Sequence, residues 1–254
     1  MNAVDQTRRF SDYDPFAWLY TTRWGAEYHE QALHILDKLF LHQLPDGATI
    51  LDLCCGDGRL TAALHGRGFR MCGIDGSEEM LGFARERCSD IPFQAGDARE
   101  FELSGRFDAV ISTFDALNHV MSAEELAQVC RRVEQALNPG GFFAFDPNRE
   151  EAYAELWPQT SAQVEPDVVS ICKGAYNSDS RIATGEITLF RLVDGVWVRS
   201  DFSLSQYAHR EEDVLNSLFA AGFADAKAFD ASGDLGMDGN IGRGRTYFLA
   251  RRGL

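Results

Sequence analysis

The feature of this chain that most constrains its fold is a regular alternation of short apolar segments with amphipathic segments between residues 49 and 146. Apolar runs at Thr49–Leu53, Phe69–Ile74 and Phe107–Thr113 have the length and composition of buried strands. Segments with the spacing of amphipathic helices follow them. Such an alternation is typical of a parallel sheet whose strands are joined by right-handed helical crossovers.

Seven segments in all have the pattern of strands of one such sheet. Besides the three runs above, they are Pro92–Ala95, Phe142–Phe145, Ala224–Phe229 and Thr246–Arg251. We therefore predict an α/β fold with a doubly wound, mostly parallel sheet of seven strands. Residues 45–149 form its core in this prediction, and residues 211–254 supply a C-terminal helix and the last two strands.

The pattern changes after Pro147. A helix near Glu150–Trp157 precedes long segments in which apolar and polar residues alternate, and turn signals separate these segments. There are three of them, at Gln163–Lys173, Arg181–Leu192 and Val196–Ala208. Residues 150–210 are therefore predicted to form a small antiparallel insert on the substrate side of the core, and Ser232–Arg245 a glycine-rich loop.

The N-terminal part of the chain is rich in aromatic residues. Residues 1–23 are predicted to be irregular, because no period relates their aromatic side chains, which are Phe10, Tyr13, Phe16, Trp18 and Tyr20. A helical period then runs from Trp24 to Leu41. Residues 1–44 are predicted to be an N-terminal helical lid that excludes water from a site on the core.

The charge of the chain restricts its partners. Its 254 residues include 24 Lys and Arg against 39 Asp and Glu, which gives a net charge of −15. Nucleic acids and anionic membranes are bound mainly through clustered basic residues, and the arginine pairs of this chain are scattered. No run approaches the ~20 apolar residues of a membrane span, and no apolar signal region is visible. We therefore expect a cytoplasmic protein, monomer or homodimer, without nucleic-acid or membrane partners.

The six cysteines do not form a recognisable metal site. No pair has the C-x-x-C spacing, and the adjacent Cys54 and Cys55 are poorly placed to hold one tetrahedral ion. We expect buried thiols in a reducing compartment and no metal.

The strongest local signal is the turn that follows the first strand. In Ile50–Gly58 a short strand runs into a turn containing Gly56 and Gly58, and a helix follows. Glycines let a ligand approach the backbone closely, and the amides at a helix N-terminus bind polar groups. A strand–helix turn without a ligand has the same local sequence, so this turn alone does not establish a binding site.

Acidic residues follow the next two strands. Asp75 ends the second strand, where it can accept hydrogen bonds from a ribose diol, and Asp97 follows the third, beside the Ala98 amide, where it can meet an adenine amino group. Because the carboxyl ends of parallel strands meet at one edge of a sheet, the three turns should converge. A nicotinamide site would share two of them, but Thr61 replaces its third glycine and Asp52 is not required there. A nucleoside without a pyrophosphate is therefore favoured.

These segments resemble a known family. Leu51–Gly58, Gly73–Leu81 and Gln94–Ala98 are similar in order and spacing to the motifs of class I S-adenosylmethionine-dependent methyltransferases. The resemblance extends from about Thr49 to Asp146 and departs from the family at Cys54, where glycine is common. It implies a Rossmann-like methyltransferase fold and S-adenosyl-L-methionine as the cofactor.

The resemblance also implies roles for individual residues. The cofactor-binding set comprises Cys54, Gly56 and Gly58 along the methionine part, Asp75 at the ribose, Gly76 and Met80 flanking the adenine, Asp97 and Ala98 at the adenine edge, and Ser112 and Thr113 at the methionine amino group. Asp52, within the first strand, also belongs to this set.

A narrower resemblance concerns the acceptor side. Phe114–Val120, the aromatic N-terminus, the insert and Gly242–Arg245 are similar to small-molecule methyltransferases, among them sugar-amine N,N-dimethyltransferases. This resemblance implies that Tyr20, with Trp24 next, lies over the cofactor and that His119 faces the substrate. A packed aromatic residue and a helix-cap histidine would explain these positions equally well.

The resulting prediction is an enzyme that moves the sulfonium methyl by in-line displacement to a nitrogen or oxygen of a small-molecule acceptor. His119 is the leading candidate for a base, ahead of Tyr20 and Asp115. Two alternatives stay open: a non-catalytic protein that binds S-adenosylmethionine or S-adenosylhomocysteine on the same fold, and a nicotinamide-dependent dehydrogenase. Asp146–Asn148 superficially resembles a signature of DNA amino-methyltransferases, but it lacks the second proline and the aromatic residue, and we reject it.

Overall fold

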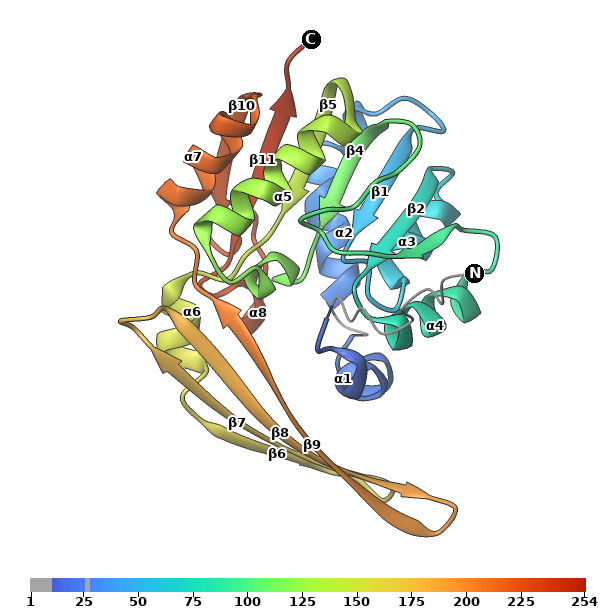
Figure 1. Ribbon diagram of the computed structural model, residues 1–254, viewed down its shortest axis with the longest axis vertical. Helices are drawn as coiled ribbons and strands as arrows, with labels where there is room; N and C mark the ends of the chain where they lie inside the picture. The colour runs from blue at the N-terminus through green and yellow to red at the C-terminus, as the bar shows by residue number, and fades with distance from the viewer. Residues whose placement is uncertain (1–10, 26–27) are drawn as a thin grey trace, which may run out of the picture.

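The structure, a computed structural model, describes residues 11–25 and 28–254, which form two sheets (Figure 1). The larger sheet has seven strands in the order β10-β11-β5-β4-β1-β2-β3, and β11 alone among them runs antiparallel to both of its neighbours. This arrangement confirms the predicted doubly wound, mostly parallel sheet. Phe10 and the other residues of the segments 1–10 and 26–27, which the predicted lid and the predicted helix Trp24–Leu41 include, lie outside the described residues.

The elements of the core alternate along the chain much as the sequence predicts. The strands of the large sheet are β1 (Thr49–Leu53), β2 (Arg70–Asp75), β3 (Phe93–Ala95), β4 (Phe107–Ser112), β5 (Leu137–Phe145), β10 (Phe223–Asp230) and β11 (Thr246–Arg252). The helices around it are α2 (Tyr28–Leu39), α3 (Arg59–Gly66), α4 (Glu78–Arg87), α5 (Ala123–Ala136), α7 (Glu211–Ala221) and the single turn α8 (Gly239–Gly242), which lies inside the predicted loop Ser232–Arg245. Two short 3₁₀ turns, η2 (Leu41–Gln43) and η3 (Ala116–His119), complete this part of the chain.

Helices cover both faces of the large sheet. On one face, α2 and α3 pack with Ile50 of β1 and Ala109 of β4 in one buried cluster. On the other face, α5 and α7 pack against Leu51 and Val110, which are the next residues along the same two strands. Because successive residues of a strand point to opposite faces, a sheet covered on both sides requires strands that are apolar throughout.

The order of the strands reverses between β1 and β4. β1 pairs with β2 on one side and with β4 on the other, so the chain winds outward from β1 in two directions. In an open α/β sheet such a reversal leaves a crevice at the carboxyl ends of the strands, where ligands bind. The turns after β1, β2, β3 and β4 all open at this edge, close to helix α1 (Asp14–Leu19) (Figure 1).

The insert after the fifth strand has four strands, where the sequence predicts three. Helix α6 (Glu150–Leu156) leads into β6 (Thr160–Val164), β7 (Val168–Asn177), β8 (Ile182–Val193) and β9 (Val196–Tyr207), which pair in chain order as an antiparallel sheet. The predicted segment Gln163–Lys173 is divided between β6 and β7, because Pro166 provides no backbone donor and the chain turns there. Figure 1 shows the insert as a long twisted ribbon that projects from the core.

Residues 14–24 are helical, which contradicts the predicted irregular segment. Helix α1 begins with Pro15 in its first turn and continues into one π-helical turn, η1 (Tyr20–Trp24). Phe16 and Leu19 are buried in a cluster with Ile187 and other residues of the insert. Packing against the insert therefore stabilises a segment that is too short to be helical by itself.

The six cysteines are free thiols, of which two are buried and four are partly buried. Among residues 11–25 and 28–254, no helix is both long enough and apolar enough to cross a membrane.

Candidate functional site

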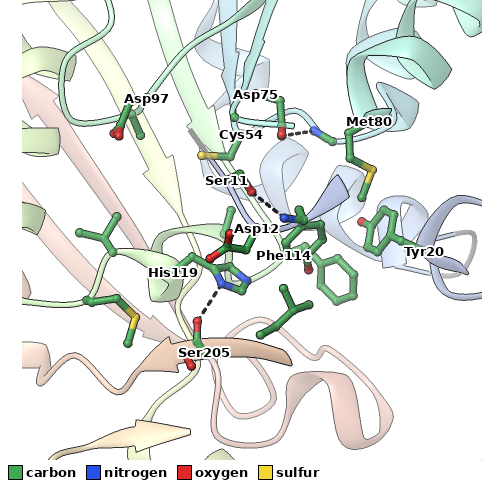
Figure 2. Close-up of a pocket in the computed structure, with 18 of the residues that line it drawn as sticks. Ser11, Asp12, Tyr20, Cys54, Asp75, Met80, Asp97, Phe114, His119 and Ser205 are labelled. Atoms are coloured by element: carbon green, nitrogen blue, oxygen red, sulfur yellow. Dashed lines mark hydrogen bonds between the residues drawn. The ribbon is translucent and has the colours of Figure 1, made fainter. Parts of the chain in front are cut away.

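A cavity of about 360 Å³ lies at the carboxyl ends of β1, β2, β3 and β4. It brings together ten of the predicted site residues: Tyr20, Cys54, Gly56, Asp75, Gly76, Met80, Asp97, Ala98, Thr113 and His119. Figure 2 shows Cys54, Asp75 and Asp97 on one side of the cavity and His119 with Ser205 on the other. The convergence of turns that the sequence predicts is therefore present in the structure.

Asp75 joins two of these turns. Its Oδ2 accepts a hydrogen bond from the Gly56 amide at 2.8 Å, and its Oδ1 accepts one from the Ser77 amide at 2.9 Å. Burial raises the pKa of this carboxyl to about 6, although the backbone amides act in the opposite direction. Asp75 is thus a carboxylate fixed at the cavity wall, with acceptor capacity left for a ligand's hydroxyl groups.

The turn after β1 is shaped for close approach to its backbone. Gly56 has φ +55°, and a Cβ built on it would lie 4.0 Å from Cε1 of Tyr20 across the cavity. Cys54 has φ +62°, a left-handed conformation that side chains other than glycine rarely adopt. The glycine common at this position in the resembled family would remove that strain. These residues fit a nucleoside-bearing ligand that lies along the turn.

The turn after β3 closes the other end of the cavity. Asp97 forms an ion pair with Arg99 at 2.6 Å, and Arg99 also pairs with Glu125 at 2.6 Å. The buried Met80 and Gly76 line the same cavity from the start of α4. A flat apolar group would fit between the Met80 side chain and this turn, with polar atoms facing Asp97.

Three predicted cofactor residues lie behind the cavity wall. Asp52 is buried and accepts a 2.5 Å hydrogen bond from Oγ1 of Thr61 in α3. Burial raises the pKa of Asp52 to about 7. Gly58 has φ +73°, and a Cβ there would lie 2.9 Å from Cβ of Ala84, so this glycine allows α3 and α4 to pack closely. Ser112 is also buried and does not reach the cavity surface.

A second cavity, of about 250 Å³, adjoins the first. Its walls come from the N-terminal helical segment and from the concave face of the insert, and Trp24 lies here and not at the first cavity. Residues two positions apart on neighbouring strands form the insert wall: Cys172 and Gly174 of β7, Gly185 and Ile187 of β8, and Leu204 and Gln206 of β9. This period of two places them on one face of the sheet.

The two cavities share a boundary formed by Tyr13, Tyr20, Phe114, His119 and Leu204. Tyr13, which was not among the predicted site residues, packs its ring edge-on against His119, with ring centroids 5.1 Å apart. The aromatic-rich segment around it was the available signal, but no period indicated which ring faces the site. A group bound in either cavity can contact the other only across this boundary.

The N-terminal segment is tied to both the core and the insert. The Ser77 hydroxyl donates to Oδ1 of Asp14 at 2.6 Å, which fixes α1 at the start of α4. Arg23 pairs with Glu165 at 2.9 Å, which fixes η1 to the turn between β6 and β7. These contacts hold the described part of the N-terminal segment where Tyr13 and Tyr20 line both cavities.

His119 is held by two polar contacts in the part of the chain that the structure describes. Its Nδ1 lies 2.9 Å from the Ser205 carbonyl oxygen, which can only accept, so this nitrogen carries the proton. Its Nε2 then has the lone pair and accepts from Nε2 of Gln206 at 3.1 Å. Burial lowers the pKa of the ring, although the nearby Asp115 acts in the opposite direction. His119 is therefore a neutral imidazole at pH 7, with its basic nitrogen at the second cavity.

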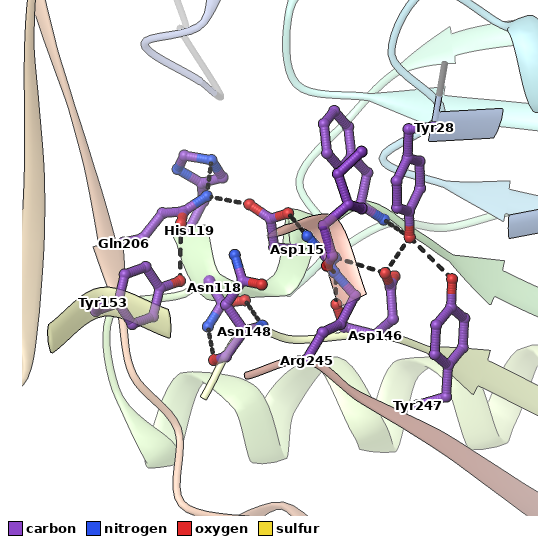
Figure 3. A network of polar contacts seen from close by, with 12 residues as sticks. Tyr28, Asp115, Asn118, His119, Asp146, Asn148, Tyr153, Gln206, Arg245 and Tyr247 are labelled. Atoms are coloured by element: carbon purple, nitrogen blue, oxygen red, sulfur yellow. Dashed lines mark hydrogen bonds and ion pairs between the residues drawn. The ribbon is translucent and has the colours of Figure 1, made fainter. Parts of the chain in front are cut away.

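A buried polar network lies next to the boundary between the two cavities (Figure 3). Arg245 donates to Asp146 at 2.6 Å and to Asp115 at 2.7 Å. The Tyr28 hydroxyl donates to Asp146 and lies 3.0 Å from the Tyr247 hydroxyl. Burial raises the pKa of Asp146 to about 6, while Arg245 opposes this shift. The sequence pattern does not predict this network, because its members come from four distant segments.

Phe114 and Asp115 have φ +62° and φ +48°, two consecutive left-handed residues in the turn after β4. Such a conformation persists only when the surrounding contacts enforce it, and it is concentrated at functional sites. Here the turn stacks the Phe114 ring on Tyr28 at 4.1 Å and directs Asp115 toward Arg245 and Gln206. The strained turn therefore places an aromatic ring and a carboxylate at the floor of the second cavity.

Comparisons with known proteins agree with this geometry. The family model described as "Methyltransferase domain" matches residues 50–141. The chain is 32% identical over 185 residues to "Putative methyltransferase YqeM" of Bacillus subtilis, which covers 71% of this chain and 75% of that protein. It is 29% identical to a dTDP-3-amino-3,4,6-trideoxy-alpha-D-glucopyranose N,N-dimethyltransferase of Streptomyces venezuelae, over 74% of this chain and 80% of that protein.

Solved structures share the fold. An S-adenosylmethionine-dependent methyltransferase from Clostridium acetobutylicum has a TM-score of 0.78 and 21% identity, covering 96% of this chain and 100% of the other. An amino pentose methyltransferase from Micromonospora echinaspora has a TM-score of 0.74 and 22% identity, covering 99% of both chains.

Proposed function

We infer the function from the premise that this chain belongs to the family of S-adenosylmethionine-dependent methyltransferases. It moves a methyl group to a small-molecule acceptor, and S-adenosylmethionine is the methyl donor. We further propose that the first cavity holds the donor, that the second cavity holds the acceptor and that the acceptor atom is a nitrogen. The nucleotide-linked amino sugar named for the Streptomyces venezuelae relative makes nitrogen the favoured atom.

In this proposal, different residues of the first cavity bind different parts of the donor. Asp75 accepts from the ribose hydroxyl groups, Asp97 and Ala98 face the adenine edge, and Met80 packs against the adenine ring. The backbone from Cys54 to Gly56 and Thr113, just after β4, line the methionine part. When bound, S-adenosylmethionine supplies a methyl group on a positively charged sulfur, which an acceptor lone pair displaces in line.

The chain contributes mainly position, desolvation and a proton acceptor. Holding two reactants in line can supply ~7–11 kcal/mol of a barrier. The boundary rings of Tyr13, Tyr20 and Phe114 keep water from the point where the cavities meet. Burial raises the pKa of Tyr20 well above 10, so its hydroxyl stays protonated and positions the reactants as a donor. His119 Nε2 takes the proton that an amine acceptor loses.

The observation that carries the proposal is the carboxylate of Asp75, bonded to the Gly56 amide, at the wall of a cavity formed by four strand ends. Calorimetric titration with S-adenosylmethionine tests it. Asp75→Ala should weaken donor binding at least tenfold, because the ribose loses its charged acceptor; hydrogen bonds to charged groups contribute ~1.5–3 kcal/mol each. Asp225→Ala, at an exposed position of β10, is the matched control and should leave the affinity unchanged. Equal affinity of Asp75→Ala and the unaltered protein would refute the assignment.

The alternatives left open by the sequence are not favoured. The matched domain model, the Bacillus subtilis relative and the Clostridium acetobutylicum structure are all described as methyltransferases, which argues against a nicotinamide-dependent dehydrogenase. A non-catalytic donor-binding protein would have no need of an adjoining cavity with a basic nitrogen at its boundary. Release of S-adenosylhomocysteine in the presence of an acceptor separates an enzyme from a binding protein.

A further inference from the structure

We propose that the methyl acceptor is a compact amine with an apolar or aromatic body, bound in the second cavity, and that Asp115 selects the amine. This inference rests on the function proposed above and names the class of acceptor. It separates this chain from its relatives that are named for nucleotide-linked amino sugars.

Two glycines that face each other on neighbouring strands line the second cavity. Gly174 of β7 lies directly opposite Gly185 of β8, so two side chains are missing from the same place on the concave face of the insert. A Cβ on Gly174 would lie 2.0 Å from the Trp157 carbonyl oxygen, so backbone packing requires that glycine. A Cβ on Gly185 would meet only ordinary contacts, at 3.8 Å from Cys172 and from Trp157. Nothing in the packing requires Gly185, and its missing side chain provides space for a ligand.

The side chains that line the second cavity determine which ligands it can bind. Half of the lining residues are aromatic or aliphatic, namely Tyr13, Phe16, Tyr20, Trp24, Phe114, Trp157, Ile187 and Leu204, and the other half are small or polar. Aromatic faces attract both apolar rings and organic cations. A volume of about 250 Å³ is below the ~300–1,000 Å³ of pockets for drug-sized ligands, so the occupant is small.

The charged side chains at the second cavity restrict its ligands further. Among the described residues that line the second cavity there is no lysine or arginine, and Asp115 is the acidic one. Proteins bind diphosphates with arginine, lysine or a helix N-terminus, and the walls of this cavity offer a carboxylate in their place. A nucleotide-linked sugar would therefore have to place its diphosphate away from these walls, while an amine without phosphate would not.

The polar groups are gathered at one end of the cavity. Asp115 Oδ2 accepts from the Gln206 amide at 2.6 Å, and the same amide nitrogen lies 3.1 Å from His119 Nε2. Behind them, the carboxylates of Asp115 and Asp146 share the single guanidinium of Arg245, which leaves one negative charge. A protonated amine is attracted to this end, and His119 Nε2 can then accept its proton. An alcohol of the same shape lacks the positive charge and gains no such attraction.

These groups account for the proton, the bonds and the charges in the methyl transfer. The ammonium first replaces the Gln206 amide as the donor to His119 Nε2 and then loses a proton to that nitrogen, which restores the lone pair of the amine. That lone pair forms the new bond to the methyl carbon, and the carbon–sulfur bond breaks with its electron pair staying on sulfur. The products are S-adenosylhomocysteine and the methylated ammonium ion, whose positive charge the Asp115 carboxylate offsets.

The test is a panel of acceptors of matched shape. The protein saturated with S-adenosylhomocysteine is titrated by calorimetry with benzylamine, phenethylamine and cyclohexylmethylamine, with the corresponding alcohols, and with a dTDP-linked amino hexose. Release of S-adenosylhomocysteine from the donor complex is measured with the same compounds. At least one amine should bind and react at least tenfold better than its alcohol and than the nucleotide-linked sugar. Preference for the nucleotide-linked sugar, equal treatment of amines and alcohols, or no response to any amine would overturn the proposal.

Two variants test whether the amine binds in the second cavity and whether Asp115 selects it. Gly185→Leu fills the space opposite Gly174 and should weaken amine binding at least tenfold, while Val193→Leu, farther along the same strand and outside both cavities, should not. Asp115→Asn keeps the shape and removes the charge, so it should reduce the preference for amine over alcohol at least tenfold. Amine binding that is unchanged by Gly185→Leu would contradict the proposal.

Titration with S-adenosylmethionine distinguishes a wrong acceptor class from a wrong proposed function. If the unaltered protein does not bind the donor, the proposed function fails. If it binds the donor, and Gly185→Leu binds it equally well, the donor site stands and the failure concerns the acceptor class.

Discussion

The guanidinium of Arg245 lies 2.7 Å from the Asp115 carboxylate, although 130 positions separate the two residues in the sequence. The same guanidinium reaches Asp146 at the end of β5. Arg245 thus connects the loop before β11 to the strained turn after β4 and to the floor of the second cavity. The floor of the second cavity therefore depends on a contact between the middle and the end of the chain.

This contact predicts a large effect of Arg245→Ala on stability. The Arg245 side chain is 4% exposed, so its removal leaves the buried Asp146 and the partly buried Asp115 without their cation. Breaking a buried ion pair by removing one partner destabilises a protein by ~3–5 kcal/mol. We expect a decrease of that size in the free energy of unfolding, measured by urea titration. Arg131→Ala, at an exposed position of α5, should change it by less than ~0.5 kcal/mol; equal effects of the two variants would contradict the role given to Arg245.

Much of the fold and of the first cavity could be predicted because the signals are local. Gly56, Asp75 and Asp97 each lie at or just after the end of a strand, and the geometry of parallel sheets brings strand ends together without further information. The network of Arg245 and Tyr28 could not be predicted, because nothing near either residue indicates its partners. Tyr13 was missed for a similar reason, since tertiary packing against the insert, and not a local period, makes its segment helical.

The left-handed backbone at Cys54 predicts that glycine is better there. The residue has φ +62°, which costs ~1–2 kcal/mol for a side chain with a Cβ. Loss of the thiol and the greater freedom of glycine in the unfolded chain offset part of this gain. Cys54→Gly should therefore raise the free energy of unfolding by up to ~1 kcal/mol, with donor affinity maintained. Cys55→Gly is the neighbouring control: Cys55 is buried and its φ is not left-handed, so that change should lower stability.

Asp52 predicts a pH dependence of stability. Burial raises its pKa from 3.8 to about 7 in the folded protein, so the folded state holds this proton more tightly than the unfolded state does. The stabilisation is complete below pH 3.8 and is lost as the pH rises toward 7. Asp52→Asn keeps an oxygen to accept from Thr61 and removes the titration.

The advantage of Asp52→Asn over the unaltered protein should therefore increase between pH 5 and pH 8. Denaturant unfolding of both proteins at the two pH values measures it, and carboxyl groups common to both cancel in the comparison. Asp225→Asn, at an exposed position, should show the same difference from the unaltered protein at both pH values. A constant difference for Asp52→Asn as well would show that Asp52 titrates alike in the folded and unfolded states.

His119→Asn should slow methyl transfer without weakening donor binding much. If Nε2 takes the proton from the acceptor, kcat should fall by ~10²–10⁴-fold, which is the usual contribution of a positioned base. Since burial lowers the pKa of the ring below 6.5, the unaltered enzyme should lose activity only below that pH, and the variant should lack this decline. Rates at saturating amine between pH 5 and pH 8 measure both effects, with the exposed His42→Asn as a control. An unchanged kcat for His119→Asn would show that the proton leaves by another path, such as water.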